Sequence, residues 1–115
     1  MELEIGVGEF IDRQSILMIK KSNGLSVENE LRKMEEKNSL FSNLGFFHYL
    51  NLMVAINTAL WDLEGTKRSG ISRADQIYVE VSELITQLND LRFITKRQID
   101  EYFESEITEK KSHRL

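Results

Sequence analysis

The chain has 115 residues, of which 41% are hydrophobic and 30% charged, and its formal net charge is −4. This balance is typical of one soluble globular domain, and no apolar run approaches the ~20 residues of a membrane span. The absence of cysteine excludes disulfides and thiolate metal sites. Lys and Arg are interleaved with acids, so we expect no nucleic acid and no membrane as partner. An acidic N-terminus, unlike a signal peptide, indicates a cytoplasmic location.

The sequence predicts an all-α fold, with residues 1–115 as a single domain built as a compact four- or five-helix antiparallel bundle. The absence of proline and the scarcity of strand-like alternation both favour helices. Residues 1–7 are expected to be an extended lead-in with at most a short edge strand. A first helix, buried on more than one side, is expected over 8–22. Gly24 then suits a left-handed C-terminal cap.

The middle of the chain predicts two further helices. Ser26 is the expected N-cap of the second helix, and Gly45 is expected to end it or to kink it into the third. The third helix is expected over about 46–67. It is the most apolar element, which indicates that it forms the centre of the bundle.

The last predicted helix begins after Ser72, with Asp75 at the spacing of a capping box. It runs either from 73 to about 105 or breaks near Asn89, since Asn and Asp are cap residues. The polar residues after 105 predict a frayed end. The apolar residues expected to form its inner stripe are Ile77, Val81, Leu84, Leu88, Leu91 and Tyr102.

Two polar residues of the third helix fall in the middle of its apolar stripe. On a helical wheel with Asn57 as zero, five apolar residues from Leu50 to Trp61 lie within about 60°, and Glu64 lies within about 20°. A buried amide or carboxylate without a partner costs a few kcal/mol. Asn57 and Glu64 therefore require partners from other helices.

The other helices offer complementary polar groups at the margin of the core. These are a ridge of Asn89, Arg92 and Lys96 on the fourth helix, and Glu9, Arg13 and Lys20 along one side of the first. We therefore predict that Asn57 and Glu64 face the ridge across the interface between the third and fourth helices.

Two interpretations of this polar cluster stay open. In the first, Glu64 pairs with a cation of the fourth helix, and the network fixes helix register. In the second, the cluster is a ligand pocket, in which Trp61 and Tyr78 supply flat apolar walls. The cations expected to hold an anionic group there are Arg92, Lys96 and Lys20.

Catalytic and metal sites have weaker support. Glu9 and Asp12 could hold a divalent cation together with Glu64, as in a metal-dependent all-α hydrolase, but the nearby cations disfavour this. His48 and His113 lie far apart in sequence, and no set of His, Asp and Glu residues has the spacing of metal ligands. We therefore expect no catalytic residue, no metal and no cofactor.

Three stretches resemble a small bacterial and phage domain family of unknown function. They are GEFIDRQSILMIK (8–20), NTALWDLE (57–64) and LNDLRFITKRQID (88–100). The resemblance picks out Gly8, Glu9, Asp12, Lys20, Asn57, Trp61, Glu64, Asn89, Asp90, Arg92 and Lys96. This chain departs from the family pattern at Gly65, which replaces an acid, and at Asp100, which replaces the closing Asn. The family has no established activity, so the resemblance implies a site and no reaction.

The favoured hypothesis is a self-associating, non-catalytic protein that binds a small anionic ligand, and one concrete version of it is a ligand of nucleotide origin. In a phage, such a protein would sequester an immune signal, with Trp61 stacking on a base and Arg92 and Lys96 holding phosphates. The alternatives are a protein-interaction or inhibitor module with a structural polar cluster, and the metal-dependent hydrolase. The residues expected to bind the ligand are Glu9, Asp12, Lys20, Asn57, Trp61, Glu64, Asn89, Arg92 and Lys96.

Overall fold

Four α-helices form the fold over the residues that the computed structural model describes, namely 3, 5–41 and 44–113, with the backbone alone at 44 and 105–113. They are α1 (Val7–Ser22), α2 (Glu28–Glu36), α3 (Leu44–Arg68) and α4 (Gln76–His113), and the 3-10 turn Lys37–Leu40 follows α2. No strand occurs among the described residues, so the all-α class is confirmed and an edge strand is not seen at 3 or 5–7. None of the helices described is both long and apolar enough to cross a bilayer.

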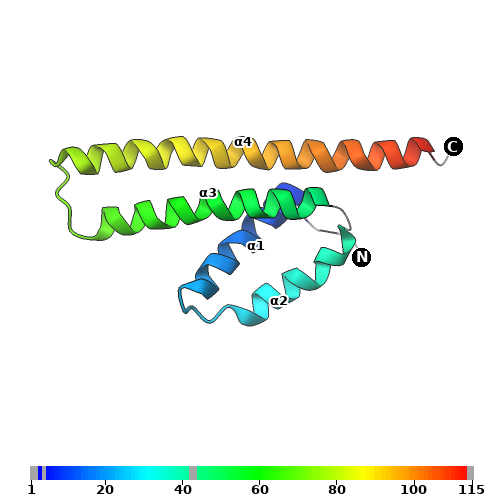
Figure 1. Ribbon diagram of the computed structural model, residues 1–115, viewed down its shortest axis with the longest axis horizontal. Helices are drawn as coiled ribbons and strands as arrows, with labels where there is room; N and C mark the ends of the chain where they lie inside the picture. Colours follow the sequence, from blue (N-terminus) through cyan, green and yellow to red (C-terminus); the bar gives the residue numbers. More distant parts are fainter. Residues whose placement is uncertain (1–2, 4, 42–43, 114–115) are drawn as a thin grey trace.

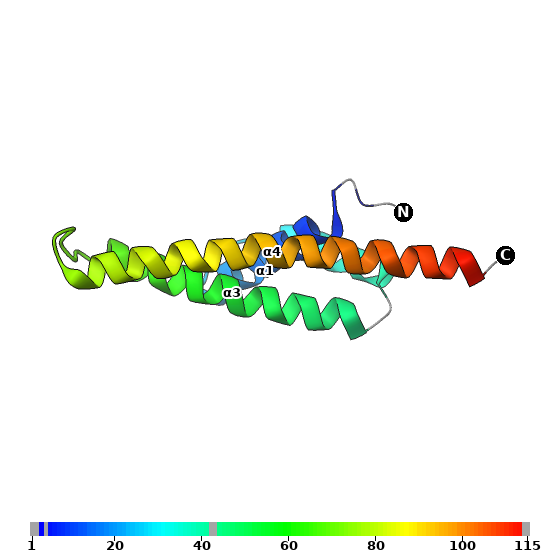
Figure 2. The same ribbon diagram turned by 90° about the horizontal axis from the view of Figure 1, so that it is seen from above.

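The helices pack as two crossed pairs. The long helices α3 and α4 run antiparallel, and α1 passes behind α3 at a steep angle in the view of Figure 1. The shorter α2 returns alongside α1, and Figure 2 shows how α4 extends along the whole length of the molecule. The result is an elongated bundle of 62 × 29 × 22 Å, in which α1 contacts both long helices.

The end of α1 follows the sequence prediction. Gly24 has a φ of +83°, the left-handed conformation that a residue with a Cβ rarely adopts. The Gly24 N–H donates to the Lys21 carbonyl, and the Leu25 N–H donates to the Lys20 carbonyl, each at 3.0 Å. This is the paired arrangement by which a glycine cap satisfies the last carbonyls of a helix.

Other helix ends differ from prediction. The N-cap of α2 is Val27 and not Ser26, because the Val27 carbonyl accepts the first helical hydrogen bond, from Leu31. Gly45 neither ends a helix nor kinks one, since it lies in the first turn of α3. A Cβ at Gly45 would lie 2.4 Å from the Tyr102 hydroxyl, so the glycine makes room for that ring. The Ser72 N–H donates to Asp75 as expected, at 3.1 Å, although α4 begins only at 76.

The inner face of α4 is rotated from the predicted stripe. The helix is unbroken at Asn89, and its backbone continues past 105 to His113. Val81 is buried and Leu88 half-buried, but four members of the predicted stripe are 38–57% exposed: Ile77, Leu84, Leu91 and Tyr102. The buried face instead carries Val81, Ile85, Thr95, Ile99 and Phe103. The polar contacts of Arg92 and Lys96 account for this rotation, because both side chains must face α1 to reach Asp12 and Glu9.

The core lies where α1, α3 and α4 meet. Its fully buried members include Ile11 from α1, Phe46 and Met53 from α3, and Ile99 from α4, each 0% exposed. Phe41, just after the 3-10 turn, stacks on Phe46 with ring centroids 4.8 Å apart and closes this core at the α2 end. The same three helices also supply the polar groups of the site.

Candidate functional site

A buried ion pair joins α1 to α4 at the centre of the candidate site. Asp12 is 1% exposed although it is an acid, and the fork of Arg92 holds both of its carboxylate oxygens. Arg92 Nε donates to Oδ1 at 2.9 Å, and one terminal nitrogen donates to Oδ2 at 2.6 Å. Hydrogen bonding to Asp12 raises the pKa of Arg92 above its ordinary range. This two-pronged geometry is the strongest form of Arg–carboxylate contact.

The amide of Asn57 brings α3 into the same contact. Its Nδ2 donates to Asp12 Oδ1 at 2.8 Å and to the Ser15 hydroxyl at 2.7 Å, and Asn57 itself is buried. The Ser15 hydroxyl in turn donates to the Asp12 backbone carbonyl at 2.6 Å. The amide of Asn57, which lies in the apolar stripe of α3, is therefore hydrogen-bonded to α1.

A second ion pair lies one turn earlier along α1. Lys96 Nζ donates to Glu9, which also accepts a hydrogen bond from Arg13 Nε at 2.9 Å. These two contacts, led by Lys96, lower the pKa of Glu9 from its ordinary 4.5. Lys96 also lies 3.7 Å from Asp12, so the two pairs form one continuous network. Glu9 and Lys96 are partly exposed, which makes this pair weaker than the buried one.

The start of α1 is fitted against the backbone of α4. The Gly8 N–H donates to Asp100 Oδ1 at 2.8 Å, which places a carboxylate at the positive end of α1. A Cβ at Gly8 would lie 2.4 Å from the Lys96 carbonyl oxygen, so no larger residue fits without a shift of one helix. The close approach brings Glu9 and Asp12 within reach of their cations on α4.

A pocket of about 270 Å³ opens beside this network, between α1, α3 and α4. Its walls combine apolar side chains with the edge of the network, and its lining residues are Ile16, Ile19, Asn57, Leu60, Trp61, Glu64, Arg68, Asn89 and Arg92. Most ligand sites share this composition of apolar walls with a few polar groups.

Three polar side chains of the pocket have no partner. Within the described part of the chain, Glu64, Arg68 and Asn89 make no side-chain hydrogen bond or ion pair, although Glu64 is half-buried. Trp61 is half-buried beside them. The pocket is therefore lined by the indole of Trp61 and by three polar side chains, Glu64, Arg68 and Asn89, that are available to bind a ligand.

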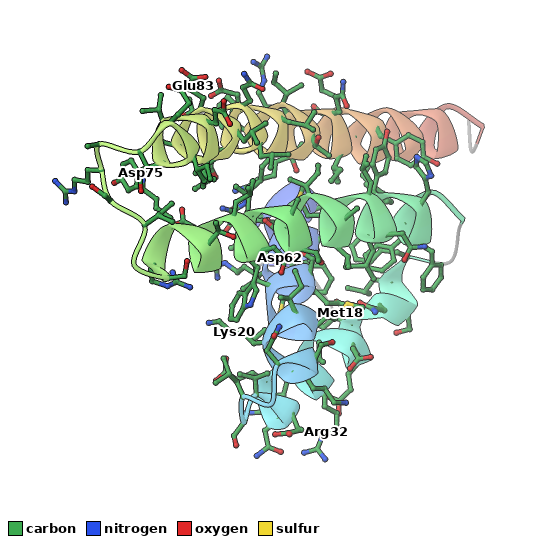
Figure 3. The ribbon with its side chains drawn as sticks, turned by 60° about the vertical axis from the view of Figure 1, so that its left-hand side comes forward. Met18, Lys20, Arg32, Asp62, Asp75 and Glu83 are labelled. Carbon is green, nitrogen blue, oxygen red and sulfur yellow. The ribbon has the colours of Figure 1, made fainter. Side chains whose placement is uncertain are left out.

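The structure brings together five of the predicted ligand residues at this pocket and places the other four elsewhere. The five that line it are Asn57, Trp61, Glu64, Asn89 and Arg92. Glu9, Asp12 and Lys96 belong to the network behind it. Lys20 lies on the part of α1 away from α4, as Figure 3 shows, and lines a separate pocket between α1 and α2.

The predicted pairing of Glu64 with Arg92 or Lys96 is wrong. Both cations are instead paired with acids of α1, because α1 packs against both long helices beside the ridge. Tyr78, predicted as a pocket wall, lies instead under the Lys67 ammonium, 5.1 Å from its ring centre. Nor do three acidic or histidine side chains come together as a metal site within the described residues, which leaves the hydrolase hypothesis without its ligand set.

The sequence reasoning missed three residues that the site uses. Arg68 lies about 20° from Asn57 on the wheel of α3, and it was overlooked because the predicted helix ended at 67. Ser15 follows Asp12 by three residues, the spacing at which a helical side chain reaches back to a carbonyl. Asp100 was noted only as a departure from the family pattern, and its role could not be predicted because it depends on where α1 begins relative to α4.

Comparison with protein-family models, curated proteins and solved structures gives no match to this chain. The resemblance of the three motifs to a bacterial and phage domain family therefore stays a prediction. The function is argued from the geometry of the network and the pocket.

Proposed function

We propose that this protein binds a small ligand of the nucleotide class in the pocket between α1, α3 and α4. The observation that carries the proposal is the convergence of Trp61, Glu64, Arg68 and Asn89 on one concavity, where the three polar groups have no partner within the described residues. Glu64 is half-buried, and a half-buried polar group gains more than the exposed Arg68 and Asn89 from a ligand that completes its hydrogen bonds.

The chemistry of the four side chains fits a nucleobase with an attached phosphate. The Trp61 indole offers a flat face for base stacking, a contact worth about 1–3 kcal/mol per base. Glu64 can accept hydrogen bonds from ring or amino N–H groups, and the Asn89 amide can both donate and accept. Arg68 is exposed at the last turn of α3, where it can hold a phosphate in two-pronged fashion.

The size of the pocket supports a single base and not a larger ligand. About 270 Å³ lies just below the usual range of ligand pockets, roughly 300–1,000 Å³. A sugar and phosphate would therefore project to the rim, toward Arg68. This assigns the phosphate to Arg68 and not to Arg92 and Lys96, which the acids of α1 already neutralise.

The buried network gives the pocket its shape in this proposal. Arg92 and Asn57 line the pocket with one side and are fixed by Asp12 on the other. Side chains locked in this way lose no further freedom when a ligand binds, which favours affinity. The network and pocket interpretations are thus two parts of one site.

The biological role we propose is sequestration of a nucleotide-derived signal. Among the described residues that line the pocket, Glu64 has no second acid and no histidine beside it, which supports binding without conversion. The motifs that resemble a family with phage members favour a counter-defence protein, which would remove an immune signal by holding it.

Thermal unfolding with a ligand panel tests the proposal. The panel is a nucleoside, the matching nucleoside monophosphate and inorganic phosphate, and a ligand at 100 times its dissociation constant stabilises by about 2.7 kcal/mol. We expect Arg68→Gln to reduce the response to the monophosphate to that of the nucleoside. Arg73→Gln is the matched control, because Arg73 is also exposed but does not line this pocket.

Stabilisation by phosphate alone, equal in wild type and Arg68→Gln, would contradict the proposal. So would a panel in which no nucleoside or nucleotide shifts unfolding at any soluble concentration. Loss of the nucleoside response in Trp61→Ala, with the fold intact by circular dichroism, is the further result that the stacking role requires.

A further inference from the structure

One flank of α4 leaves large apolar side chains without cover. Ile77, Leu84, Leu91 and Ile94 are 57%, 46%, 45% and 49% exposed. The first three repeat at intervals of seven residues, the spacing of a helix seam that packs on another helix. We refer to these four residues as the open flank of α4.

The open flank faces away from α1. Arg92 marks the side of α4 that contacts α1, and on a helical wheel the four residues lie about 60–160° from it, all in one rotational sense. Asn89, which lines the pocket, lies about 60° from Arg92 in the opposite sense. The open flank and the ligand pocket are therefore separate surfaces.

The side of α3 turned away from α1 also carries small and apolar side chains. Leu52, Ala55, Ala59 and Leu63 lie about 120–160° from Asn57, the residue of α3 that contacts α1. Leu52 is 37% exposed and Ala55 is also exposed. Small and apolar residues there allow another helix to approach closely, and exposed apolar side chains gathered on one side of a protein often mark an interaction surface.

The charges beside the open flank indicate what covers it. Glu83 and Arg97 are exposed, and neither makes an ion pair or side-chain hydrogen bond within the described residues. Glu83 points away from α3 at the outer edge of α4 (Figure 3). The two residues lie seven positions before and seven positions after Asp90. A second α4 laid antiparallel about a two-fold axis near Asp90 would thus place each Glu83 opposite an Arg97.

We propose that the protein forms a homodimer in which the α4 helices of two copies pack antiparallel along the open flank. In this register Leu84 meets Ile94 of the second copy, and Leu91 meets Gln87 of the second copy. Each Glu83 meets an Arg97, and every contact occurs twice, as a two-fold interface requires. Asp90 faces its own copy near the axis, which weakens the dimer.

Solution mass tests the dimer directly. The monomer has a mass of 13.4 kDa, and light scattering after size exclusion should give twice that value for wild type. We expect Leu84→Lys and Leu91→Lys each to raise the dissociation constant of the dimer at least about tenfold. The reason is that each substitution places one lysine charge from each copy in the buried helix interface. Phe93→Lys is the matched control, since Phe93 is 62% exposed on the other side of α4.

Charge exchange tests the antiparallel register. Glu83→Arg and Arg97→Glu should each weaken the dimer about two- to fivefold, as expected for an exposed ion pair, and the double variant should recover wild-type association. Asp90→Asn should tighten the dimer, because it removes the repulsion at the axis. Circular dichroism establishes that each variant is folded.

A wild type that stays monomeric at its highest soluble concentration would overturn the proposal. A dimer that Phe93→Lys disrupts and Leu91→Lys does not would overturn it as well. A double charge variant no stronger than either single one would refute the antiparallel register. The inference does not rest on ligand binding, so Leu91→Lys should keep the nucleotide response of wild type.

Discussion

Arg92→Met is expected to destabilise the protein strongly, because it leaves a buried carboxylate without its main partner. The change removes the charge of Arg92 and its two hydrogen bonds to Asp12, at 2.9 and 2.6 Å, but keeps an unbranched side chain. Asp12 is 1% exposed in the native protein. Of its partners among the described side chains, Asp12 then retains Asn57 at 2.8 Å and the Lys96 ammonium at 3.7 Å.

The expected loss in free energy of unfolding is about 3 kcal/mol. Breaking a buried ion pair costs roughly 3–5 kcal/mol, and the remaining ammonium near Asp12 places this case at the lower end. Asp12→Asn should cost less, about 2 kcal/mol, because the Arg92 side chain is 29% exposed and can turn to water. Since domains have only about 5–15 kcal/mol of stability, both losses are large.

Urea unfolding of both variants and of their combination measures the pair. We expect the double variant to lose at least 1 kcal/mol less than the sum of the single losses, because both charges leave together. Glu64→Gln is the matched control, since this acid has no partner within the described residues and should change stability by less than about 0.5 kcal/mol. Strict additivity of the two single changes, or a loss from Glu64→Gln as large as that from Asp12→Asn, would refute the reasoning.

Three further predictions concern other parts of the structure. Trp61→Ala should cost about 1–2 kcal/mol in chemical unfolding, because Trp61 is half-buried, against about 3–5 for the buried Phe46→Ala; equal losses would make Trp61 a core residue. Gly8→Ala should lower the melting temperature, because the added Cβ overpacks the contact with α4. Gly65→Ala should raise it, because the added Cβ meets nothing within 4 Å and alanine favours the helix. A rise in both variants would contradict the close approach of α1 and α4. Because the pKa of Glu9 is lowered in the folded protein, a fall in pH protonates Glu9 of the unfolded chain before Glu9 of the folded protein. The stability that Glu9 confers is therefore present above pH 4.5 and is lost as the pH falls through its folded pKa. Glu9→Gln should flatten that part of the stability–pH curve, and an unchanged acid slope would count against the pair.

The helices themselves could be predicted well from the sequence. The first and third were expected at 8–22 and about 46–67 and are found at Val7–Ser22 and Leu44–Arg68. Apolar periodicity and the glycine at 24 are local signals and placed these two helices, whereas the ends of α2 and α4 differ from prediction.

The pairing between helices could not be predicted in the same way. A helical wheel gives the direction of Arg92 on its own helix but not the path of α1 across α4. Asp12 was therefore interpreted as a candidate metal ligand. Arg92, which pairs with Asp12 in the structure, was predicted to pair with Glu64. The exposure of Leu84 and Leu91 has the same origin, because the contact with α1 sets the rotation of α4.

The indole resonance of Trp61 offers the most direct test of ligand binding in the pocket. Trp61 is the single tryptophan of the chain, so its side chain gives one indole N–H signal in a two-dimensional ¹H–¹⁵N spectrum. We expect titration with a nucleoside monophosphate to shift this signal together with the side-chain amide of Asn89, and inorganic phosphate alone to leave both in place. A nucleotide that binds while both signals stay unmoved, or a panel of nucleotides that moves neither, would contradict the assignment of this pocket as the binding site.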